Sequence, residues 1–372
     1  QWNLNRSAAL HLREEKNITG GETSADPFLQ THQVTMADQK LIVILGATGN
    51  QGSSVVDTFL KDAAWRVRGL TRNPSSTKAK ALSARGVEVV QADMDDVASL
   101  SVAFRDANAI FVVSDFWGIY GALAQQEKGT GEKPLNLLAG ETEFQQLKNA
   151  IDAASQVPGL ERFILSTLSN VAKWSREKYT HVYHFDFKAR ASAYIEDKHQ
   201  ELWAKTSLFQ AGLFLSTFVD SPSFMPRKAK SADISQIADG TAQFTTTMAP
   251  DVKLPWIAAE EDTGPFVKAL VQEEPGKNLI AYREWATLRE MVGAFQSASK
   301  TKSELVVVPR DEANEFLPPD LKLEIDEGFF ISKSLGRDDA TIVHPSQLKT
   351  PPELDTMEQY FRKVDLSRIF SA

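Results

Sequence analysis

The chain has 372 residues, a formal net charge of −8 and no cysteine. This length allows one large domain or two smaller ones with a sizeable core. The acidic balance, without any block of lysine and arginine, argues against a nucleic-acid-binding surface. The lack of cysteine excludes disulfides, a thiol nucleophile and a cysteine zinc site, and the six histidines show no metal-binding spacing. No apolar run approaches the length of a membrane span.

Residues 1–36 differ from the rest of the chain. They are polar, carry mixed charge and show no apolar periodicity. The longest apolar piece, Ala8 to Leu12, is interrupted by His11 and lacks the hydrophobic region of a signal peptide. We therefore expect a disordered leader, a cloning remnant or an over-extended gene reading, with Met36 as the natural start. A cytoplasmic location is the default expectation.

The most informative stretch runs from Lys40 to Gly52, KLIVILGATGNQG. A short apolar run leads into three glycines, and a helical pattern follows, which is the strand–turn–helix opening of a dinucleotide-binding unit. The glycines permit a tight turn, a close approach of backbone N–H groups to a pyrophosphate, and close packing of helix on strand. The pyrophosphate then lies at the positive end of the helix. The residues of this turn that we expect to bind the cofactor are Gly46, Thr48, Gly49, Asn50, Gln51 and Gly52.

Strand and helix patterns alternate along the first two thirds of the chain. After the first strand and helix, strands are expected at 65–70, 87–91, 109–114, 162–166 and 207–214. Helices are expected at 76–85, 95–105, 141–155 and 188–205, and an exposed loop at 118–134. This alternation predicts an α/β fold, namely a Rossmann-like, doubly wound parallel sheet with right-handed crossovers.

The C-terminal part is less regular and predicts a smaller, discontinuous substrate-binding lobe. We assign 37–220 to the nucleotide-binding domain, with 250–285 returning to it. We assign 221–249 and 286–372 to the lobe. The basic loop at 227–230 and the 118–134 loop could together form a lid over a substrate.

The end of the second strand indicates which nucleotide is bound. Arg72 lies 20 residues after the third glycine, where an NAD-binding fold usually carries an acid for the ribose 2′-hydroxyl. An arginine offers a bidentate donor to a 2′-phosphate instead, and Lys78 could assist it. No acid occurs from Leu70 to Lys80, which favours NADP(H) over NAD. Asp93 and Met94, after the third strand, are expected to flank the adenine or to cap the next helix.

The catalytic lysine has two candidate positions. Short-chain dehydrogenases use a Tyr-x-x-x-Lys pair, in which the lysine lowers the pKa of the general-acid tyrosine and holds the nicotinamide ribose. The literal match is Tyr194 with Lys198, but only 14 residues separate Lys198 from Gly212. Lys188 lies 24 residues before Gly212, and this longer spacing matches that of short-chain dehydrogenases. We therefore predict Lys188 as the active-site lysine.

Histidine stands where the tyrosine would be. His184 lies four residues before Lys188 and could donate a proton, because the reference pKa of histidine is near neutrality. A structural role for His184 stays open. An open pocket lined by Trp174, Tyr183 and Phe224 would favour an enzyme. The expected catalytic residues are Lys188, His184, Tyr183 and Ser166.

Five motifs in order resemble the NmrA-like family of atypical short-chain dehydrogenases, which is related to isoflavone reductase-like proteins. They are GATGNQG, LTRNPSS, GVEVVQADMDD, the Ser114-Asp115-Phe116-Trp117 exit of strand four, and HFDFKARASAYIE. The resemblance spans about Lys40 to Leu270 and fits a fungal-type protein. It implies NADP(H) binding, with Ser114 and Phe116 among the cofactor-binding residues, and a small C-terminal lobe.

The resemblance leaves two functions open. The first is an NADPH-dependent oxidoreductase that tailors a small secondary-metabolite-type carbonyl, imine or conjugated alkene, with or without a redox-coupled rearrangement or cyclisation. The second is a non-catalytic NADP(H) sensor that binds a protein partner in a nucleotide-dependent way, for which the missing tyrosine argues. Neither function implies direct contact with nucleic acid or membrane, and no metal is expected.

Overall fold

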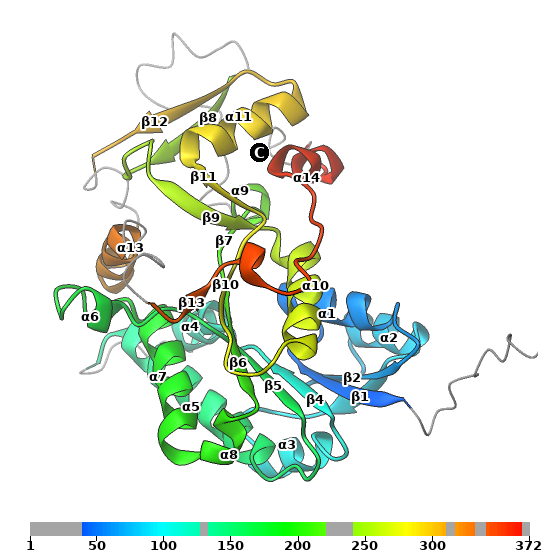
Figure 1. Cartoon of the computed structure of the whole chain (residues 1–372). Coiled ribbons are helices and arrows are strands. Elements are labelled where there is room, and N and C mark those ends of the chain that lie inside the picture. Colours follow the sequence, from blue (N-terminus) through cyan, green and yellow to red (C-terminus); the bar gives the residue numbers. More distant parts are fainter. Residues whose placement is uncertain (1–38, 127–132, 221–240, 310–316, 332–339, 367–372) are drawn as a thin grey trace, which may run out of the picture.

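The computed structural model describes residues 39–126, 133–220, 241–309, 317–331 and 340–366. An eight-stranded sheet with helices on both faces forms its larger part, and two small sheets with further helices form the rest (Figure 1). The leader at 1–36, the basic loop at 227–230 and Phe224 lie outside the described residues.

The large sheet has the strand order β13-β10-β6-β5-β4-β1-β2-β3, and every recorded pairing in it is parallel. The order reverses direction at β1, which creates the crevice between β1 and β4 where ligands bind in such sheets. The predicted doubly wound parallel sheet is confirmed. Its strands are β1 (Lys40–Leu45), β2 (Trp65–Thr71), β3 (Glu88–Gln91), β4 (Ala109–Val112), β5 (Arg162–Thr167), β6 (Thr206–Ala211), β10 (Asn278–Ala281) and β13 (Ile342–Val343).

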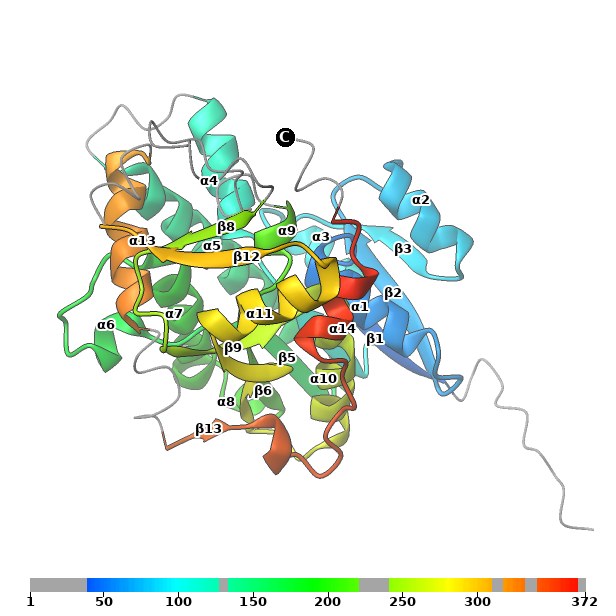
Figure 2. The same cartoon turned by 90° about the horizontal axis from the view of Figure 1, so that it is seen from above.

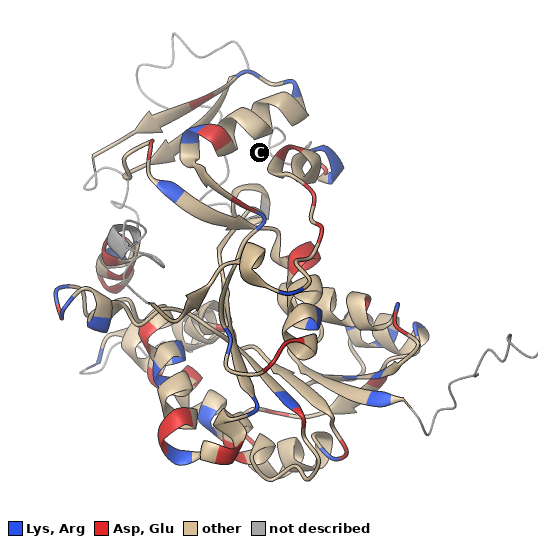
Figure 3. Cartoon of the chain, in the orientation of Figure 1, with Lys and Arg blue, Asp and Glu red and all other residues tan. Residues whose placement is uncertain are grey.

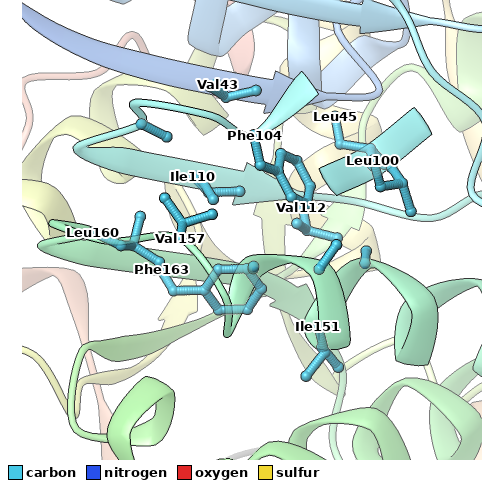
Figure 4. Close-up of a cluster of buried hydrophobic side chains, with 14 of the residues drawn as sticks. Val43, Leu45, Leu100, Phe104, Ile110, Val112, Ile151, Val157, Leu160 and Phe163 are labelled. Atoms are coloured by element: carbon cyan, nitrogen blue, oxygen red, sulfur yellow. The ribbon is translucent and has the colours of Figure 1, made fainter. Parts of the chain in front are cut away.

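Each face of this sheet has its own apolar core. The central strands are almost continuously apolar because both faces are covered. On one face, side chains of α3 (Val97–Ala103), α5 (Leu135–Ala154), α7 (Tyr183–Lys198) and α8 (Gln200–Trp203) pack with those of the central strands. Figure 4 draws part of this cluster, including Val43, Ile110 and Phe163 from the strands. On the other face the core includes α1 (Asn50–Phe59), α2 (Thr77–Ala84) and α10 (Ala259–Gln272).

The smaller lobe consists of two short sheets and their helices, in the upper part of Figure 1. One sheet has the order β11-β9-β7 and the other pairs β12 with β8, around a third apolar core. Its strands are β7 (Leu213–Phe214), β8 (Ala242–Thr246), β9 (Lys253–Ile257), β11 (Glu284–Thr287) and β12 (Ser303–Val307). Its helices are α9 (Thr217–Asp220), α11 (Leu288–Ser299) and α14 (Met357–Lys363).

The boundary between the parts differs from the expected one at three places. Strand β7 and helix α9 belong to the small lobe, although 37–220 was assigned to the nucleotide-binding domain. Strand β9 pairs within the small lobe, although 250–285 was assigned to the nucleotide-binding domain. Strand β13 is an edge strand of the large sheet and pairs with β10, although 286–372 was assigned to the lobe. The 3-10 turn η2 (Pro345–Gln347) follows β13, and Leu348 then packs into the core of the large sheet. The chain therefore returns to the large sheet a second time.

The predicted loop at 118–134 is wrong in its first half. Helix α4 runs from Phe116 to Gln125, and α5 already begins at Leu135. Two glycines, Gly118 and Gly121, suggested a loop, but Asp115 caps the helix by accepting a hydrogen bond from the Gly118 N–H at 3.0 Å. Residues 127–132 lie outside the described part of the chain.

The helix predicted at 188–205 begins earlier and ends earlier. Helix α7 starts at Tyr183 and ends at Lys198, and α8 follows after His199, whose φ of −132° is not helical. The early start places His184 and Lys188 in one helix, where residues four apart lie on the same face.

A glycine fixes the position of the helix that follows the glycine turn. Helix α10 packs on α1, and a Cβ at Gly264 would overlap the carbonyl oxygen of Ser54 and the hydroxyl of Thr58. The Gly264 N–H also donates to the Ser54 hydroxyl at 2.9 Å. Close backbone approach here holds α1, and with it the glycine turn.

We predict that Gly264→Ala lowers the free energy of unfolding by about 2 kcal/mol, since the added methyl group forces α1 and α10 apart. Gly293→Ala is the control, because Gly293 lies in α11 with no atom within 4 Å of an added Cβ. It should be neutral or stabilise by up to about 1 kcal/mol. Urea unfolding of both variants measures the difference, and equal stabilities would contradict the packing argument.

Candidate functional site

The glycine turn forms an anion-binding cradle at the carboxyl end of β1. Gly46 has φ +83°, and a Cβ at Gly52 would overlap the Gly46 carbonyl oxygen. Gly49 is the N-cap of α1, without a side-chain cap, and the first turn of α1 holds no acid. The first N–H groups of this helix are therefore available to an anion. These features fit a dinucleotide pyrophosphate.

Two cations lie beside this cradle. Arg72 directly follows β2, the neighbour of β1, and is exposed. Its guanidinium forms no hydrogen bond or ion pair with a described residue. Lys78, in the first turn of α2, reaches back to the Thr48 carbonyl oxygen at 3.4 Å. The structure thus brings Lys78 to the glycine turn and places Arg72 at the adjacent strand end, as a 2′-phosphate site requires.

Asp93 and Met94 form the turn between β3 and α3. Asp93 accepts from the Asp95 N–H at 3.1 Å, and Met94 packs against the core of that sheet face. The cap of α3 is Asp96, whose side chain accepts from Ala98 and Ser99. No described contact decides whether Asp93 and Met94 also flank an adenine, so that role stays a prediction.

Lys188 lies in a buried polar cluster with Ser114 and Glu143. The Lys188 ammonium forms an ion pair with Glu143 Oε1, and Glu143 is completely buried. The Ser114 hydroxyl donates to the same oxygen at 2.8 Å. Ser114 follows β4 and Glu143 belongs to α5, so the cluster joins the carboxyl end of the sheet to two helices. Glu143 was missed because an acid in a helical pattern is usually solvent-exposed.

Ser166 connects the end of β5 to the glycine turn. Its buried hydroxyl donates to Gln51 Oε1 at 2.8 Å. Next to it, Thr167 Oγ1 accepts from the Ser192 hydroxyl at 2.9 Å. Ser166, Gln51 and the Lys188 cluster therefore gather at the carboxyl ends of β1, β4 and β5.

His184 lies between aromatic rings and a buried acid. Its ring centroid is 5.7 Å from that of Phe116 and 5.1 Å from that of Trp117. Its Nδ1 pairs with Glu324 Oε1 at 2.6 Å, and Glu324 is fully buried. No described residue forms a hydrogen bond with Nε2. The acid thus fixes the ring and leaves one nitrogen free. The predicted cofactor residue Phe116 is buried against His184.

Tyr183 begins α7 and packs against Phe187 and His181. Burial, followed by the charges of Glu324 and Glu327, raises the pKa of its hydroxyl. This is the opposite of the lowered pKa that a short-chain dehydrogenase tyrosine has. Trp174 ends α6 (Val171–Trp174) and is half-buried.

The literal Tyr-x-x-x-Lys match lies elsewhere. The Tyr194 hydroxyl donates to Asp152 at 2.7 Å, and Lys198 is 61% exposed and paired with Asp197. Ten residues of helix place Lys198 about 15 Å from Lys188. The contacts of this pair are those of a helix surface.

One helix of the C-terminal region supplies acids to this site. Helix α13 (Pro319–Ile331) lies beside α4, α5 and α7 in Figures 1 and 2, and its acidic positions are red in Figure 3. Glu324 accepts from the His184 N–H at 2.8 Å, and Asp320 accepts from the Asn136 N–H at 3.2 Å. Helices α7 and α5 have no side-chain cap of their own. Carboxylates from α13 take that role.

The other acids of this face extend the contact. Glu327 accepts from the His181 N–H at 2.8 Å and pairs with its Nδ1 at 2.9 Å. Burial and the charge of Asp320, which is hydrogen-bonded to the hydroxyl, raise the pKa of Tyr120 on α4 to about 12. Helix α13 was not assigned to the site from the sequence, and only its spacing of acids on one helical face could have indicated it.

The family profile described as NmrA-like matches residues 38–361. The chain belongs to the NmrA-like family. The resemblance predicted from the five motifs is thereby confirmed, and it extends well past Leu270.

Known proteins of this kind are similar to the chain at low identity. The NmrA-like family domain-containing oxidoreductase cpsB of Aspergillus campestris is 26% identical over 282 residues, covering 72% of this chain and 75% of the relative. The structure of NmrA, a negative transcriptional regulator, in complex with NADP has a TM-score of 0.65 at 18% identity and covers 88% of this chain and 95% of its own. Leucoanthocyanidin reductase of Vitis vinifera, with NADPH, has a TM-score of 0.60 at 16% identity, covering 89% and 100%. These structural similarities show the shared NmrA-like fold.

Within the described ranges, no helix of this NmrA-like chain combines the length and apolar character that crossing a membrane requires.

We predict that Glu324→Ala lowers the free energy of unfolding by about 3 kcal/mol, because it removes a buried carboxylate that binds the His184 ring and also caps α7. The control is Leu323→Ala on the same helix, where the side chain is 43% exposed. That change should cost less than about 0.5 kcal/mol. Chemical denaturation compares the two, and a Glu324 variant as stable as the control would contradict the capping role.

The buried carboxyl of Asp186 should make the stability of the folded state depend on pH. Burial raises the pKa of this carboxyl from 3.8 to about 6, although the Val171 and Ala172 N–H groups donate to it. The folded state therefore holds the proton more tightly than the unfolded state. The resulting stabilisation is present below pH 3.8 and is lost as the pH rises through 6.

Asp186→Asn keeps an acceptor for the two N–H groups but cannot titrate. Its melting temperature relative to the wild type should therefore increase as the pH rises from 4 to 7. Asp197→Asn is the control, because Asp197 is 70% exposed. Thermal melts at closely spaced pH values measure this, and a difference that does not change with pH would refute the assignment.

Proposed function

We propose that this NmrA-like chain is an NADP(H)-dependent oxidoreductase. The observation that supports this most is the glycine cradle with Arg72 and Lys78 beside it and no acid from Leu70 to Lys80. A 2′-phosphate needs such donors, whereas a ribose 2′-hydroxyl needs an acid. Structural relatives are known with NADP and NADPH, and NmrA also with NAD, so the choice of NADP(H) for this chain rests on Arg72, Lys78 and the missing acid.

The proposed substrate is a small secondary-metabolite-type carbonyl, imine or conjugated alkene. When bound, NADPH would supply the hydride. Lys188 would hold the nicotinamide ribose, and His184 would provide the proton. His184 Nε2, which forms no hydrogen bond with a described residue, supports this role over Tyr183, whose raised pKa makes the hydroxyl a poorer acid, and over Ser166, whose hydroxyl already binds Gln51. The relative from Aspergillus campestris is named an oxidoreductase, which supports an enzymatic function for this chain.

Product formation tests the activity. Candidate metabolites are incubated with NADPH, and products are identified by mass spectrometry, because redox cycling could leave no net cofactor oxidation. Turnover that disappears in Lys188→Ala supports the proposal. Tight NADPH binding without turnover across a broad panel would favour the alternative.

The alternative is a nucleotide sensor, for which one observation argues specifically. Residue 184, four before the lysine, is histidine, and a tyrosine general acid is therefore missing from that position. The structural relative NmrA is described as a negative transcriptional regulator. A sensor would bind a protein partner whose affinity changes with the nucleotide. A pull-down that is insensitive to NADP(H) would exclude it.

We predict that Arg72→Ala weakens NADPH binding by about 1.5–3 kcal/mol and leaves NADH binding nearly unchanged, since a charge-assisted contact to the 2′-phosphate is lost. The control is Arg105→Ala, an exposed arginine that precedes β4 and so lies toward the amino ends of the parallel strands, away from the glycine turn. Fluorescence titration with both nucleotides measures the effect. An equal loss for NADPH and NADH would refute the 2′-phosphate assignment.

A further inference from the structure

The buried carboxylate of Glu143 is not explained by the fold. It lies on α5 with no solvent exposure, and both recorded donors, the Lys188 ammonium and the Ser114 hydroxyl, bind its Oε1. Oε2 is also buried, and no described residue forms a hydrogen bond with it. Leaving a buried carboxylate oxygen without a donor is costly, so a residue selected only for packing would be apolar here.

Glu143 also provides the counter-charge for the buried side chain of Lys188. Lys188 is itself only 9% exposed, and a buried amine loses its proton readily unless a negative charge lies beside it. Other acids near Lys188 are already engaged. Asp186 binds the N–H groups that begin α6, Glu324 binds His184, and the exposed Asp115 caps α4. Among the described residues, Glu143 is the recorded ion-pair partner of Lys188.

We propose that Glu143 is a positioning residue that keeps Lys188 protonated and directed toward the ribose of the nucleotide. Ser114 holds the carboxylate from the end of β4, so the ammonium is fixed relative to the crevice. The proposal rests on the proposed NADP(H) binding and adds a residue to that site. It explains why a carboxylate, with one oxygen unsatisfied, is buried at this point of α5.

The test uses NADPH titrations of the full chain between pH 7.5 and 9.5. If the Glu143 carboxylate holds the proton on the Lys188 ammonium, wild-type affinity should vary less than about twofold in this range. In Glu143→Gln the isostere keeps the volume but removes the charge, and the ammonium should lose its proton within the range. The affinity of this variant should therefore fall about tenfold between pH 7.5 and 9.5.

Two further variants separate positioning from a general structural role. In a Lys188→Met background, Glu143→Gln should add no pH dependence, because no amine remains to titrate. Glu143→Asp keeps the negative charge but moves it away from the Lys188 ammonium. The NADPH affinity of this variant should therefore fall with pH more steeply than that of the wild type and less steeply than that of Glu143→Gln. This variant also carries the test should Glu143→Gln fail to fold.

The outcomes are distinct. If the wild type binds NADPH and both Glu143 variants stay as insensitive to pH as the wild type, the positioning role is wrong. If Glu143→Gln has the same pH dependence with and without Lys188, the effect does not act through the lysine and the proposal is also wrong. If the wild type does not bind NADPH at any pH, the proposed function fails first.

Discussion

The site depends on one close approach of backbone to backbone. Helix α1 can begin at the end of β1 only because Gly52 has no side chain to overlap the Gly46 carbonyl oxygen. From the other side, Gly264 of α10 allows its helix to contact Ser54 equally closely. Helix α1 is thus held between a strand and a helix more than 200 residues apart in sequence, and its N-terminus is fixed where an anion would bind. Everything proposed about the nucleotide follows from this placement.

The second constraint comes from the end of the chain. Three acids on one face of α13 contact the starts of α5 and α7 and the histidine pair His181 and His184. A helix start without its own cap has unpaired N–H groups, and a carboxylate both pairs them and interacts favourably with the helix dipole. Helix α7 is therefore completed by a segment that follows the small lobe in sequence. Its stability and the orientation of His184 depend on the same carboxylate, Glu324.

The features that could be predicted from the sequence are those that local patterns of residues determine. The alternating strands, the glycine turn and the position of Lys188 follow from periodicity, residue type and spacing, and the structure places Ser166, Lys188 and Ser114 around one crevice as expected. Contacts between Glu324 and His184 join residues 140 apart in sequence, and no local pattern specifies such a pairing. Helix α4 was missed because its glycines lower helix propensity, whereas the Asp115 cap overrides that preference. The start of α7 was placed too late for a related reason, since its cap comes from another element.

The two departures from the tyrosine–lysine arrangement belong together. In that arrangement an uncompensated ammonium lowers the pKa of a tyrosine, which would otherwise release its proton only in alkaline solution. Here the Lys188 charge is compensated by Glu143, and an ammonium paired in this way is less able to act on a neighbouring hydroxyl. Histidine does not need that help, because as a residue type it exchanges protons near neutral pH. A site with His184 four residues before a compensated Lys188 can therefore retain proton transfer while assigning the lysine to binding alone. The carboxylates that hold these two side chains, Glu143 for Lys188 and Glu324 for His184, are as much a part of this arrangement as the side chains themselves.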